Sequence, residues 1–364
     1  MKSSHKSEKL KVKNEKFEDL KFLKKFFAPF TSRVYLVGGC VRDEILGINS
    51  KEFDIEVYDI DPHKFDKLMQ KLGAKGVGKS FFVYKWKNFD ISLPRIETKT
   101  SKGHRGFKVA LTQDEKTASK RRDFTMNALM KNIFTSEILD FWGGIEDIKN
   151  KTIRHIDDKT FIEDPLRVLR AMQFASRLKF KVDKKTIQLC KTLDLKELSR
   201  ERIFMEFEKM FKSKYLYYGF YYFIVLDIAK KLLNIDFTKK EFYHLAKIYK
   251  YNPLESYFLY HLRYYKNIPA QKIKNTLNLP NNLKKEITIK KLPKTITNRF
   301  LYGLALKYPL KTFSILNRYC CEEWIKKENL WEKKYKPKKI DPQNPRFSIL
   351  QEIRNYDKII IKKG

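Results

Sequence analysis

Two acidic residues, Asp54 and Glu56, lie two positions apart in the segment Phe53–Val57, which alternates apolar and acidic side chains. This alternation is typical of a half-buried strand, and it places both carboxylates on one face. Two carboxylates on one face, with no basic residue beside them, can hold hard divalent cations. A lone pair of this kind could equally be the solvated edge of a sheet, so the hypothesis depends on its surroundings.

A glycine turn precedes this acidic pair by about fifteen residues. Val34–Val37 is a short apolar run typical of a buried strand, Gly38 and Gly39 end it, and residues 41–47 are predicted to form a short helix. Backbone N–H groups of such a turn can approach a phosphate closely. Arg42 could add a bidentate contact to a triphosphate. The turn alone is weak evidence, but the turn and the acidic pair together are more specific.

A third carboxylate, Asp90, is predicted to lie near the pair. Residues 80–86 and 89–93 are expected to form two further strands, after a helix over residues 62–72. Asp90 is flanked by apolar residues on the second of these strands, where it could assist the acidic pair. The alternative is a strand-end carboxylate bonded to backbone donors.

The remaining chain is predicted to be mostly helical. Residues 94–120 are polar, basic and interrupted by glycines, and we expect a long functional loop there. Helices are expected within residues 1–30 and from residue 122 onward, interrupted by a strand near residues 137–140. The helices predicted in this second part are residues 162–178, 184–193 and 200–212.

The composition indicates a polyanionic partner. The 364 residues include 78 Lys and Arg against 43 Asp and Glu, a formal charge of +35. Residues 211–364 alone carry 33 basic and 12 acidic side chains, and 17 of the 20 tyrosines lie after residue 212. Such a surplus favours nucleic acid or an anionic membrane as a partner, although an AT-rich genome would also produce many lysines.

The same composition argues against a secreted or membrane-spanning protein. The four cysteines show no CxxC spacing, which is typical of a reducing compartment. The longest uncharged apolar-rich run, residues 215–226, is shorter than the roughly 20 residues that a bilayer span needs. The lysine-rich N-terminus has no apolar segment of the signal-peptide type. A cytoplasmic protein without a membrane partner is expected, and the sequence does not predict its oligomeric state.

Five segments, in order, resemble a known family. They are GGCVRDEILG with FDIEV, RRDFTMNAL at residues 121–129, DFWGGIED at residues 140–147, EDPLR at residues 163–167, and LSRERI at residues 198–203. Together they are similar to the signature of the class II tRNA nucleotidyltransferases and bacterial poly(A) polymerases, in the polymerase β superfamily. The resemblance covers residues 33–212. The more common acidic pair of this family is Asp-x-Asp, and here the second member is Glu56.

The resemblance implies roles for six further residues. Arg122 would contact phosphate, while Asp123 and Asn127 would select a ribonucleotide through its hydroxyls. Asp164 and Arg167 lie three apart on a predicted helix and so share a face. In the family this pair accepts CTP or ATP and rejects GTP and UTP. Arg170, one turn further, would reach the triphosphate; the DFWGGIED segment would be a hinge.

These observations predict an α+β protein: a small mixed-sheet nucleotidyltransferase head at residues 1–150, a helical neck at 151–212 that selects the base, and a helical body and tail at 213–364 that bind tRNA. The expected enzyme adds C, C and A to the 3′ end of tRNA from CTP and ATP without a template. Two Mg²⁺ ions held by Asp54 and Glu56 would serve the chemistry. A poly(A) polymerase, or an enzyme adding only CC or only A, is the alternative, and an inactive RNA-binding protein is a third.

Overall fold

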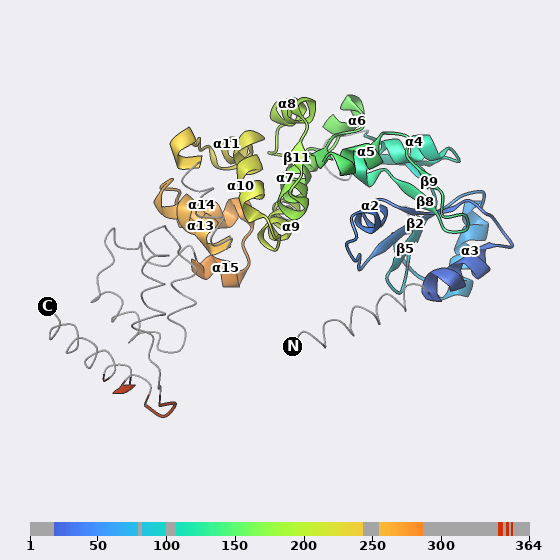
Figure 1. Cartoon of the computed structure of the whole chain (residues 1–364), viewed down its shortest axis with the longest axis horizontal. Helices are drawn as coiled ribbons and strands as arrows, with labels where there is room; N and C mark the ends of the chain where they lie inside the picture. The colour runs from blue at the N-terminus through green and yellow to red at the C-terminus, as the bar shows by residue number, and fades with distance from the viewer. Residues whose placement is uncertain are drawn as a thin grey trace. The chain divides into compact units, whose positions relative to one another are not determined.

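The structure is a computed structural model of the whole chain, and it describes residues 18–78, 82–99, 107–242 and 255–286, with a few positions between 341 and 351. The chain divides into two compact units. Residues 1–171 and 180–198 belong to the first unit, and residues 172–179 and 199–364 belong to the second. The described part of the first unit mixes strands and helices, while that of the second is helical (Figure 1), so the predicted α+β class is confirmed.

A seven-stranded mixed sheet forms the centre of the first unit, with strand order β3-β4-β5-β2-β1-β8-β9. Its strands are antiparallel neighbours except β2 and β5, which run parallel. The strands are β1 (Val34–Val37), β2 (Phe53–Val57), β3 (Lys75–Gly78), β4 (Val83–Trp86), β5 (Phe89–Ser92), β8 (Met130–Asn132) and β9 (Ile138–Leu139). The strands predicted from the glycine turn and the acidic pair are therefore confirmed.

The register of the sheet places the acidic residues. All four residues of β1 are buried, as its apolar sequence predicts. Val37 pairs with Asp54 across β1 and β2, so Asp54 lies beside the end of β1, where Gly38 begins the turn. On the other side of β2, Asp54 pairs with Asp90 of β5. Register-paired residues of neighbouring strands point to the same face, so the two carboxylates share one face of the sheet.

Four short helices flank the strands of the first unit: α2 (Gly39–Ile45), α3 (Pro62–Leu72), α4 (Glu115–Lys120) and α5 (Gly144–Lys149). Their ends follow ordinary capping rules. In α3, the Asp61 side chain accepts from Lys64 N, Pro62 occupies the first turn, and Gly73 ends the helix in the left-handed conformation. In α4, Asp114 accepts from Thr117 N. Residues 18–27 are also helical, which confirms part of the predicted N-terminal helix; residues 1–17 lie outside the described part.

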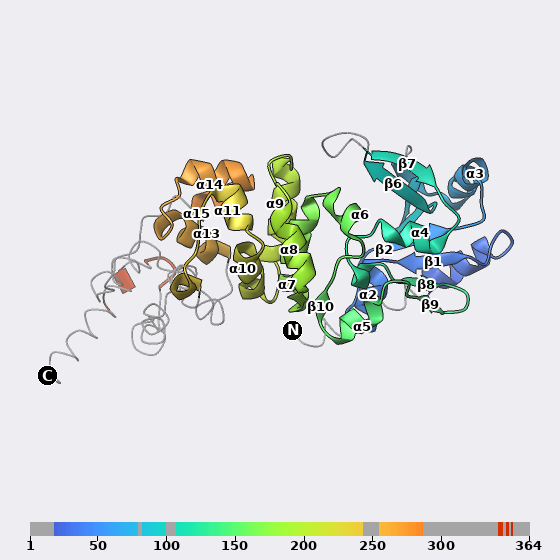
Figure 2. The same ribbon diagram turned by 90° about the horizontal axis from the view of Figure 1, so that it is seen from above.

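The prediction of a loop over residues 94–120 is wrong for most of its length. Strands β6 (Arg95–Lys99) and β7 (Phe107–Leu111) form an antiparallel pair, followed by α4. Figure 2 shows this pair as a separate ribbon beside α4. Charged residues interrupt the apolar alternation of both strands, and the backbone pairing compensates for this weak pattern. Residues 100–106, which include the predicted mobile glycines, lie outside the described residues.

The first unit ends in a second, smaller set of elements. They are β10 (Thr152–Ile153), α6 (Asp158–Ile162), the beginning of α7 (Leu166–Leu178), β11 (Lys181–Val182) and α8 (Lys184–Thr192). Strands β10 and β11 are parallel neighbours. The helix predicted at residues 162–178 is thus two helices, because Pro165 has no backbone N–H and interrupts the hydrogen-bond ladder.

The described helices of the second unit pack through aromatic rings. They are α9 (Arg200–Phe211), α10 (Leu216–Val225), α11 (Ile228–Leu233), α13 (Glu255–Tyr264), α14 (Ala270–Leu277) and α15 (Asn281–Glu286). Phe207, Phe223 and Phe258 lie within 6.2 Å of one another between ring centroids and are buried. No helix among the described residues is long and apolar enough to span a bilayer. Most of the predicted basic tail lies outside the described residues.

Gly144, at the start of α5, provides a test of close packing in the first unit. A Cβ at this position would lie 2.4 Å from the backbone oxygen of Thr125, a contact that only a backbone shift could relieve. We expect Gly144→Ala to lower the free energy of unfolding by about 3 kcal/mol, measured by thermal denaturation. Gly143→Ala is the matched control: its φ is 75°, but nothing lies within 4 Å of the added carbon, so about 1 kcal/mol of backbone strain is expected. Equal losses in the two variants would contradict this packing argument.

Candidate active site

The turn after β1 brings a backbone segment close to several of the predicted site residues. Gly38 has φ 76°, a left-handed conformation that favours glycine. A Cβ on Gly38 would lie 3.4 Å from Nη1 of Arg122 and 3.9 Å from Oδ2 of Asp54. Gly39 begins α2, as expected of a strand–turn–helix unit. The structure therefore brings Gly38, Asp54 and Arg122 together, although they are far apart in the sequence.

Asp54 and Asp90 provide two carboxylates on the same face of neighbouring strands. Asp54 is exposed and Asp90 is partly exposed. Desolvation by the surrounding protein raises the pKa of Asp54, and the charges of Asp90 and Glu56 raise it further against the opposing charges of Arg122 and Arg121. Oδ1 of Asp90 is buried and has no hydrogen-bond partner among the described residues; the Nζ of Lys85 lies 3.5 Å from it.

Glu56 has a different environment, although it lies on the same face of β2. It is 1% exposed, and its Oε1 accepts hydrogen bonds from Nη2 of Arg121 at 2.7 Å and Nη2 of Arg122 at 2.8 Å. Its Oε2 accepts from the hydroxyl of Tyr58 at 3.2 Å. Burial alone would raise the pKa of Glu56, but the two guanidinium groups outweigh it and hold that pKa below its ordinary value. The structure therefore shows Glu56 as an anionic partner of two arginines.

Four of the predicted nucleotide-binding residues form one continuous chain of hydrogen bonds. Nη1 of Arg42 donates to Oδ1 of Asn127. The Nδ2 of Asn127 donates to Oδ1 of Asp123 at 2.9 Å. Oδ2 of Asp123 accepts from Nε of Arg170 at 2.6 Å. Arg42 on α2 and Arg170 on α7 are 128 residues apart in the sequence. The segment RRDFTMNAL connects them, because it contributes the two central residues of the chain, Asp123 and Asn127.

Arg42 is more deeply placed than the sequence analysis predicts. It is 1% exposed, and its Nε and Nη2 donate to Oδ1 of the adjacent Asp43 at 2.9 and 2.6 Å. In this arrangement Arg42 is buried and positions the side chain of Asn127 through its hydrogen bond to Oδ1. Its predicted contact with a triphosphate stays a prediction.

The proposed base-selecting pair lies at the beginning of α7. Oδ1 of Asp164 accepts from the backbone N–H of Leu166 at 3.1 Å. Arg167 donates through Nη1 to the carbonyl of Thr160 at 2.9 Å and through Nη2 to the carbonyl of Arg121 at 2.7 Å. Desolvation lowers the pKa of Arg167. These contacts fix the first turn of α7 to the residue that immediately precedes Arg122.

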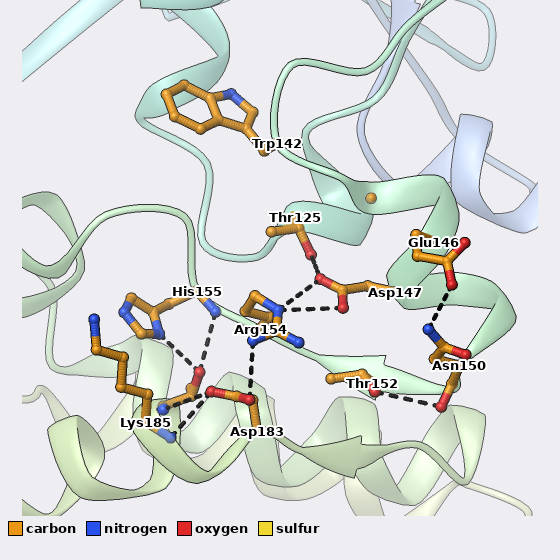
Figure 3. Close-up of polar contacts among 12 residues, drawn as sticks. Thr125, Trp142, Glu146, Asp147, Asn150, Thr152, Arg154, His155, Asp183 and Lys185 are labelled. Carbon is orange, nitrogen blue, oxygen red and sulfur yellow. Dashed lines mark hydrogen bonds and ion pairs between the residues drawn. The ribbon is translucent and has the colours of Figure 1, made fainter.

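A cluster of polar residues is hydrogen-bonded to the RRDFTMNAL segment through Thr125. Figure 3 shows the guanidinium of Arg154 between the carboxylates of Asp147 and Asp183. Asp147 also accepts from the hydroxyl of Thr125 at 2.6 Å (Figure 3). The N–H of Thr125 donates to the carbonyl of Arg154 at 2.9 Å. The segment predicted to be a hinge therefore bears a buried carboxylate that holds the Thr125 turn in place. That prediction of a hinge is not tested by these contacts.

The donors present fit a divalent cation at Asp54 and Asp90. Hard cations such as Mg²⁺ prefer carboxylate oxygens, and a buried carboxylate oxygen without a hydrogen-bond donor costs free energy unless a cation or water satisfies it. Oδ1 of Asp90 meets this description, and Asp54 pairs with Asp90 in the register of the sheet, whereas both oxygens of Glu56 already accept hydrogen bonds. The assignment of Glu56 as a metal ligand stays a prediction.

Sequence comparison with known protein families agrees with this geometry. Residues 34–154 match the family described as the poly A polymerase head domain. Residues 179–234 match the family described as the probable RNA and SrmB-binding site of polymerase A. Both matches fall in order along the chain, and the first contains the glycine turn, the carboxylates and the RRDFTMNAL segment.

Over these residues the chain is similar to the poly A polymerase head domain and to the RNA-binding domain found with it.

Proteins similar in sequence to this chain carry names that refer to CCA addition. The chain is 39% identical over 196 residues to the multifunctional CCA protein of Psychromonas ingrahamii, covering 50% of this chain and 46% of the relative. It is 36% identical over 250 residues to the CCA-adding enzyme of Buchnera aphidicola subsp. Cinara cedri, covering 63% and 57%. The chain therefore spans about half the length of the curated relatives that it matches.

Solved structures of CCA-adding enzymes share the fold over most of the chain. The Bacillus stearothermophilus CCA-adding enzyme in complex with CTP superposes with a TM-score of 0.63 at 23% identity, covering 85% of this chain and 80% of that one. The Thermotoga maritima CCA-adding enzyme complexed with tRNA gives a TM-score of 0.62 at 23% identity, covering 90% and 85%. At this identity the superposition shows that the chain shares the fold of these structures.

Several residues of this site were not singled out in the sequence analysis. Arg121 was noted only as part of a motif, yet it holds Glu56 through its side chain and Arg167 through its carbonyl. Tyr58 and Arg154 were not considered. The spacing Glu56-x-Tyr58 places both side chains on one face of the β2 segment, which is a signal for their hydrogen bond. Arg154 gives no signal in the sequence, because its partners come from α5 and the N-cap of α8.

Asp123 makes the stability of the first unit depend on pH. Burial raises the pKa of Asp123, but the charge of Arg170 and the hydrogen bond from Asn127 outweigh it and hold that pKa below its ordinary value. A lowered pKa contributes stability that is complete above the unfolded-state value near about 4 and is lost as pH falls through the lower folded value. We expect Asp123→Asn to remove this acid-side dependence and to cost about 3 kcal/mol at pH 7, measured by chemical denaturation from pH 2 to 7.

Glu44→Gln is the matched control for this variant. Glu44 pairs with Lys131 on the surface of the same unit, and its side chain is 42% exposed. Removing such a pair is expected to cost less than about 1 kcal/mol. If Asp123→Asn were no more destabilising than Glu44→Gln, the Asp123 chain of hydrogen bonds would not be a stabilising feature.

Proposed function

We propose that this chain is a CCA-adding enzyme, which adds C, C and A to the 3′ end of tRNA from CTP and ATP without a nucleic-acid template. The single observation that carries the proposal is the connection between the nucleotide-binding and base-selecting residues. Asp123 and Asn127 are bonded to Arg170 on α7, and Arg167 on the same helix is bonded to the carbonyl of Arg121. The names of the relatives support the same reaction.

The proposed reaction is attack of the RNA 3′-hydroxyl on the α-phosphate of the nucleotide, with release of pyrophosphate. Asp54 and Asp90 would hold Mg²⁺, which when bound lowers the pKa of the attacking hydroxyl and stabilises charge on the leaving pyrophosphate. The sequence-based prediction is two ions with Glu56 as a second ligand. Arg122, beside Asp54 and the Gly38 turn, would contact the triphosphate, and Asp123 with Asn127 would contact the ribose.

Base choice would come from the protein alone. CTP and ATP each present an exocyclic amine donor beside a ring-nitrogen acceptor. Asp164 can accept from the amine, and Arg167 can donate to the ring nitrogen. GTP and UTP present a carbonyl where the amine would be, so the carboxylate of Asp164 would face another acceptor. Arg170 would contribute charge toward the triphosphate rather than base choice.

A poly(A) polymerase, or an enzyme that adds only CC or only A, is the second candidate, because the matched head-domain family carries the polymerase name. One assay separates the candidates. Purified protein is given a tRNA lacking CCA, with Mg²⁺ and each NTP singly and together, and the products are sequenced. Addition of C, C and A and then termination supports the proposal; a run of A, or a stop after CC, assigns the alternative. Asp54→Ala is expected to abolish any addition while retaining tRNA binding.

Asp164 is expected to control which base is accepted. Asp164→Ala should raise incorporation of UTP and GTP relative to CTP and ATP by about tenfold, because an unmatched buried acceptor costs about 1–3 kcal/mol. The measurement is misincorporation from each single NTP on a tRNA that ends before CCA. Asp164→Asn keeps an oxygen for the N–H of Leu166 and separates base choice from helix capping. Glu163→Ala is the neighbouring control. Slowing of all four nucleotides by one common factor would remove Asp164 from base selection.

The binding of tRNA is expected to depend steeply on salt. Residues 211–364 carry a net charge of +21, which could neutralise several phosphates of the tRNA backbone. Release of the corresponding counterions should weaken the affinity on the order of 10²-fold between 50 and 200 mM salt, measured by filter binding or fluorescence anisotropy. A flat dependence would attribute the lysines to genome composition. Cytoplasmic localisation is part of this proposal and is supported by the cysteine pattern alone.

A further inference from the structure

Two lysines of the second unit lie against one tyrosine ring. Nζ of Lys179, the residue that follows α7, lies 5.5 Å from the ring centroid of Tyr215. Nζ of Lys214, in the link between α9 and α10, lies 5.4 Å from the same centroid. An ammonium group at this distance over an aromatic ring is attracted by the ring electrons. Both lysines are exposed and the ring is partly buried, so two positive charges lie together at the surface.

Contacts of the buried Ser176 hold the two segments together beneath this ring. The carbonyl of Ser176 accepts from the N–H of Tyr215 at 3.1 Å, and the Ser176 hydroxyl lies 3.3 Å from the carbonyl oxygen of Tyr215. A Cβ on Gly219 of α10 would lie 2.8 Å from Cβ of Ser176, so α10 also packs closely on α7 here. The backbones that carry Lys179 and Tyr215 are therefore joined directly.

The charges of these two lysines are not neutralised within the described part of the chain. No carboxylate of the described residues forms an ion pair with Lys179 or Lys214. Lys212 differs in this respect, because its Nζ pairs with Oε1 of Glu208 at 2.7 Å. Exposed positive charges without an anionic partner attract polyanions, and the phosphates of nucleic acid are the usual ones. Two such charges fixed beside one ring suit a ligand that carries closely spaced phosphates.

The backbone at Lys179 separates the role of its side chain in binding from any role in folding. Its φ is 60°, a left-handed conformation, at the position directly after α7. Glycine is the residue that usually ends a helix in this conformation, because it has no Cβ to strain the backbone. A lysine here carries strain that a glycine would not. The helix end therefore does not require the Lys179 side chain, which lies at the surface beside the Tyr215 ring.

We propose that Lys179 and Lys214, positioned by the ring of Tyr215, bind neighbouring phosphates of the tRNA backbone, one phosphate to each ammonium group. The inference rests on the proposed function for its ligand, and it locates a contact on the described part of the second unit. The RNA backbone is favoured over a free nucleotide because all three residues fall within the residues that match the RNA-binding domain. A backbone contact of this kind adds affinity without reading the base sequence.

The first test measures tRNA binding without catalysis. A fluorescent tRNA lacking CCA is titrated with full-length protein at several salt concentrations, without nucleotide, and its anisotropy is followed. Lys179→Gly and Lys214→Gln are each expected to lower the slope of log affinity against log salt by about 0.7 to 0.9, as the loss of one phosphate contact does. Each is also expected to weaken binding about three- to tenfold, equally for tRNAs of different sequence. Slopes that stay at the wild-type value in both variants would overturn the proposal.

Lys212→Gln is the matched control, because it removes the same charge two residues away from Lys214. Lys212 is already paired with Glu208, so its loss is expected to change tRNA affinity less than about twofold. An equal loss in Lys212→Gln and Lys214→Gln would show that only the net charge matters, and would overturn the proposal. Lys179→Gly is expected to keep or raise the melting temperature while it weakens binding, which excludes misfolding as the cause.

Two variants of Tyr215 test whether the ring positions the lysines. Tyr215→Phe keeps an aromatic ring and is expected to bind tRNA as the wild type does. Tyr215→Leu removes the ring, so both ammonium groups lose their common contact and tRNA binding is expected to weaken. Wild-type affinity in Tyr215→Leu would overturn the role assigned to the ring.

A further measurement separates the RNA backbone from nucleotide phosphates as the ligand. The KM for CTP, measured at saturating primer RNA, is expected to be unchanged in Lys179→Gly and Lys214→Gln. A raised KM for CTP with unchanged tRNA affinity would assign both lysines to the nucleotide and overturn the proposal. Wild-type protein that binds tRNA but adds no nucleotide to any primer would contradict the proposed function, whereas tRNA binding that both variants leave unchanged would contradict this inference alone.

Discussion

The site depends on one buried charge, the carboxylate of Asp123. It is 6% exposed and accepts three hydrogen bonds, from the N–H of Phe124, the amide of Asn127 and the guanidinium of Arg170. A buried carboxylate is stable only when its oxygens are bonded, so these three partners must occupy nearly fixed positions. Because the partners belong to a loop, a 3₁₀ turn and α7, fixing one charge fixes the relative placement of the elements that carry the nucleotide-binding groups.

The sequence was sufficient for the parts of the site that depend on local patterns. Alternation predicted β2 and the shared face of Asp54 and Glu56, and the apolar run before Gly38 predicted β1. The order of motifs placed Asp123, Asn127 and Arg170 in one site, which their hydrogen bonds now connect. In each case the relevant information lies within a few residues, or in the order of short segments along the chain.

The sequence was insufficient where a distant partner determines the environment. Asp54 and Glu56 are equivalent by periodicity, but two arginines 65 and 66 residues away from Glu56 make it a buried ion-paired group. Arg42 was expected to extend toward a phosphate, and it is instead buried against Asn127, 85 residues later. Strands β6 and β7 were missed for the same reason, because their backbone pairing compensates for an apolar pattern that charged residues interrupt.

The way in which Arg167 is held has an evolutionary consequence. Its two donated hydrogen bonds end on main-chain carbonyls, those of Thr160 and Arg121, rather than on side chains. Every amino acid supplies such a carbonyl, so a substitution at position 121 or 160 leaves the acceptor for Arg167 in the protein. The orientation of the Arg167 guanidinium therefore depends on the backbone path of the fold. The side chains of the residues that supply these two carbonyls can differ between related proteins while both hydrogen bonds of Arg167 are kept.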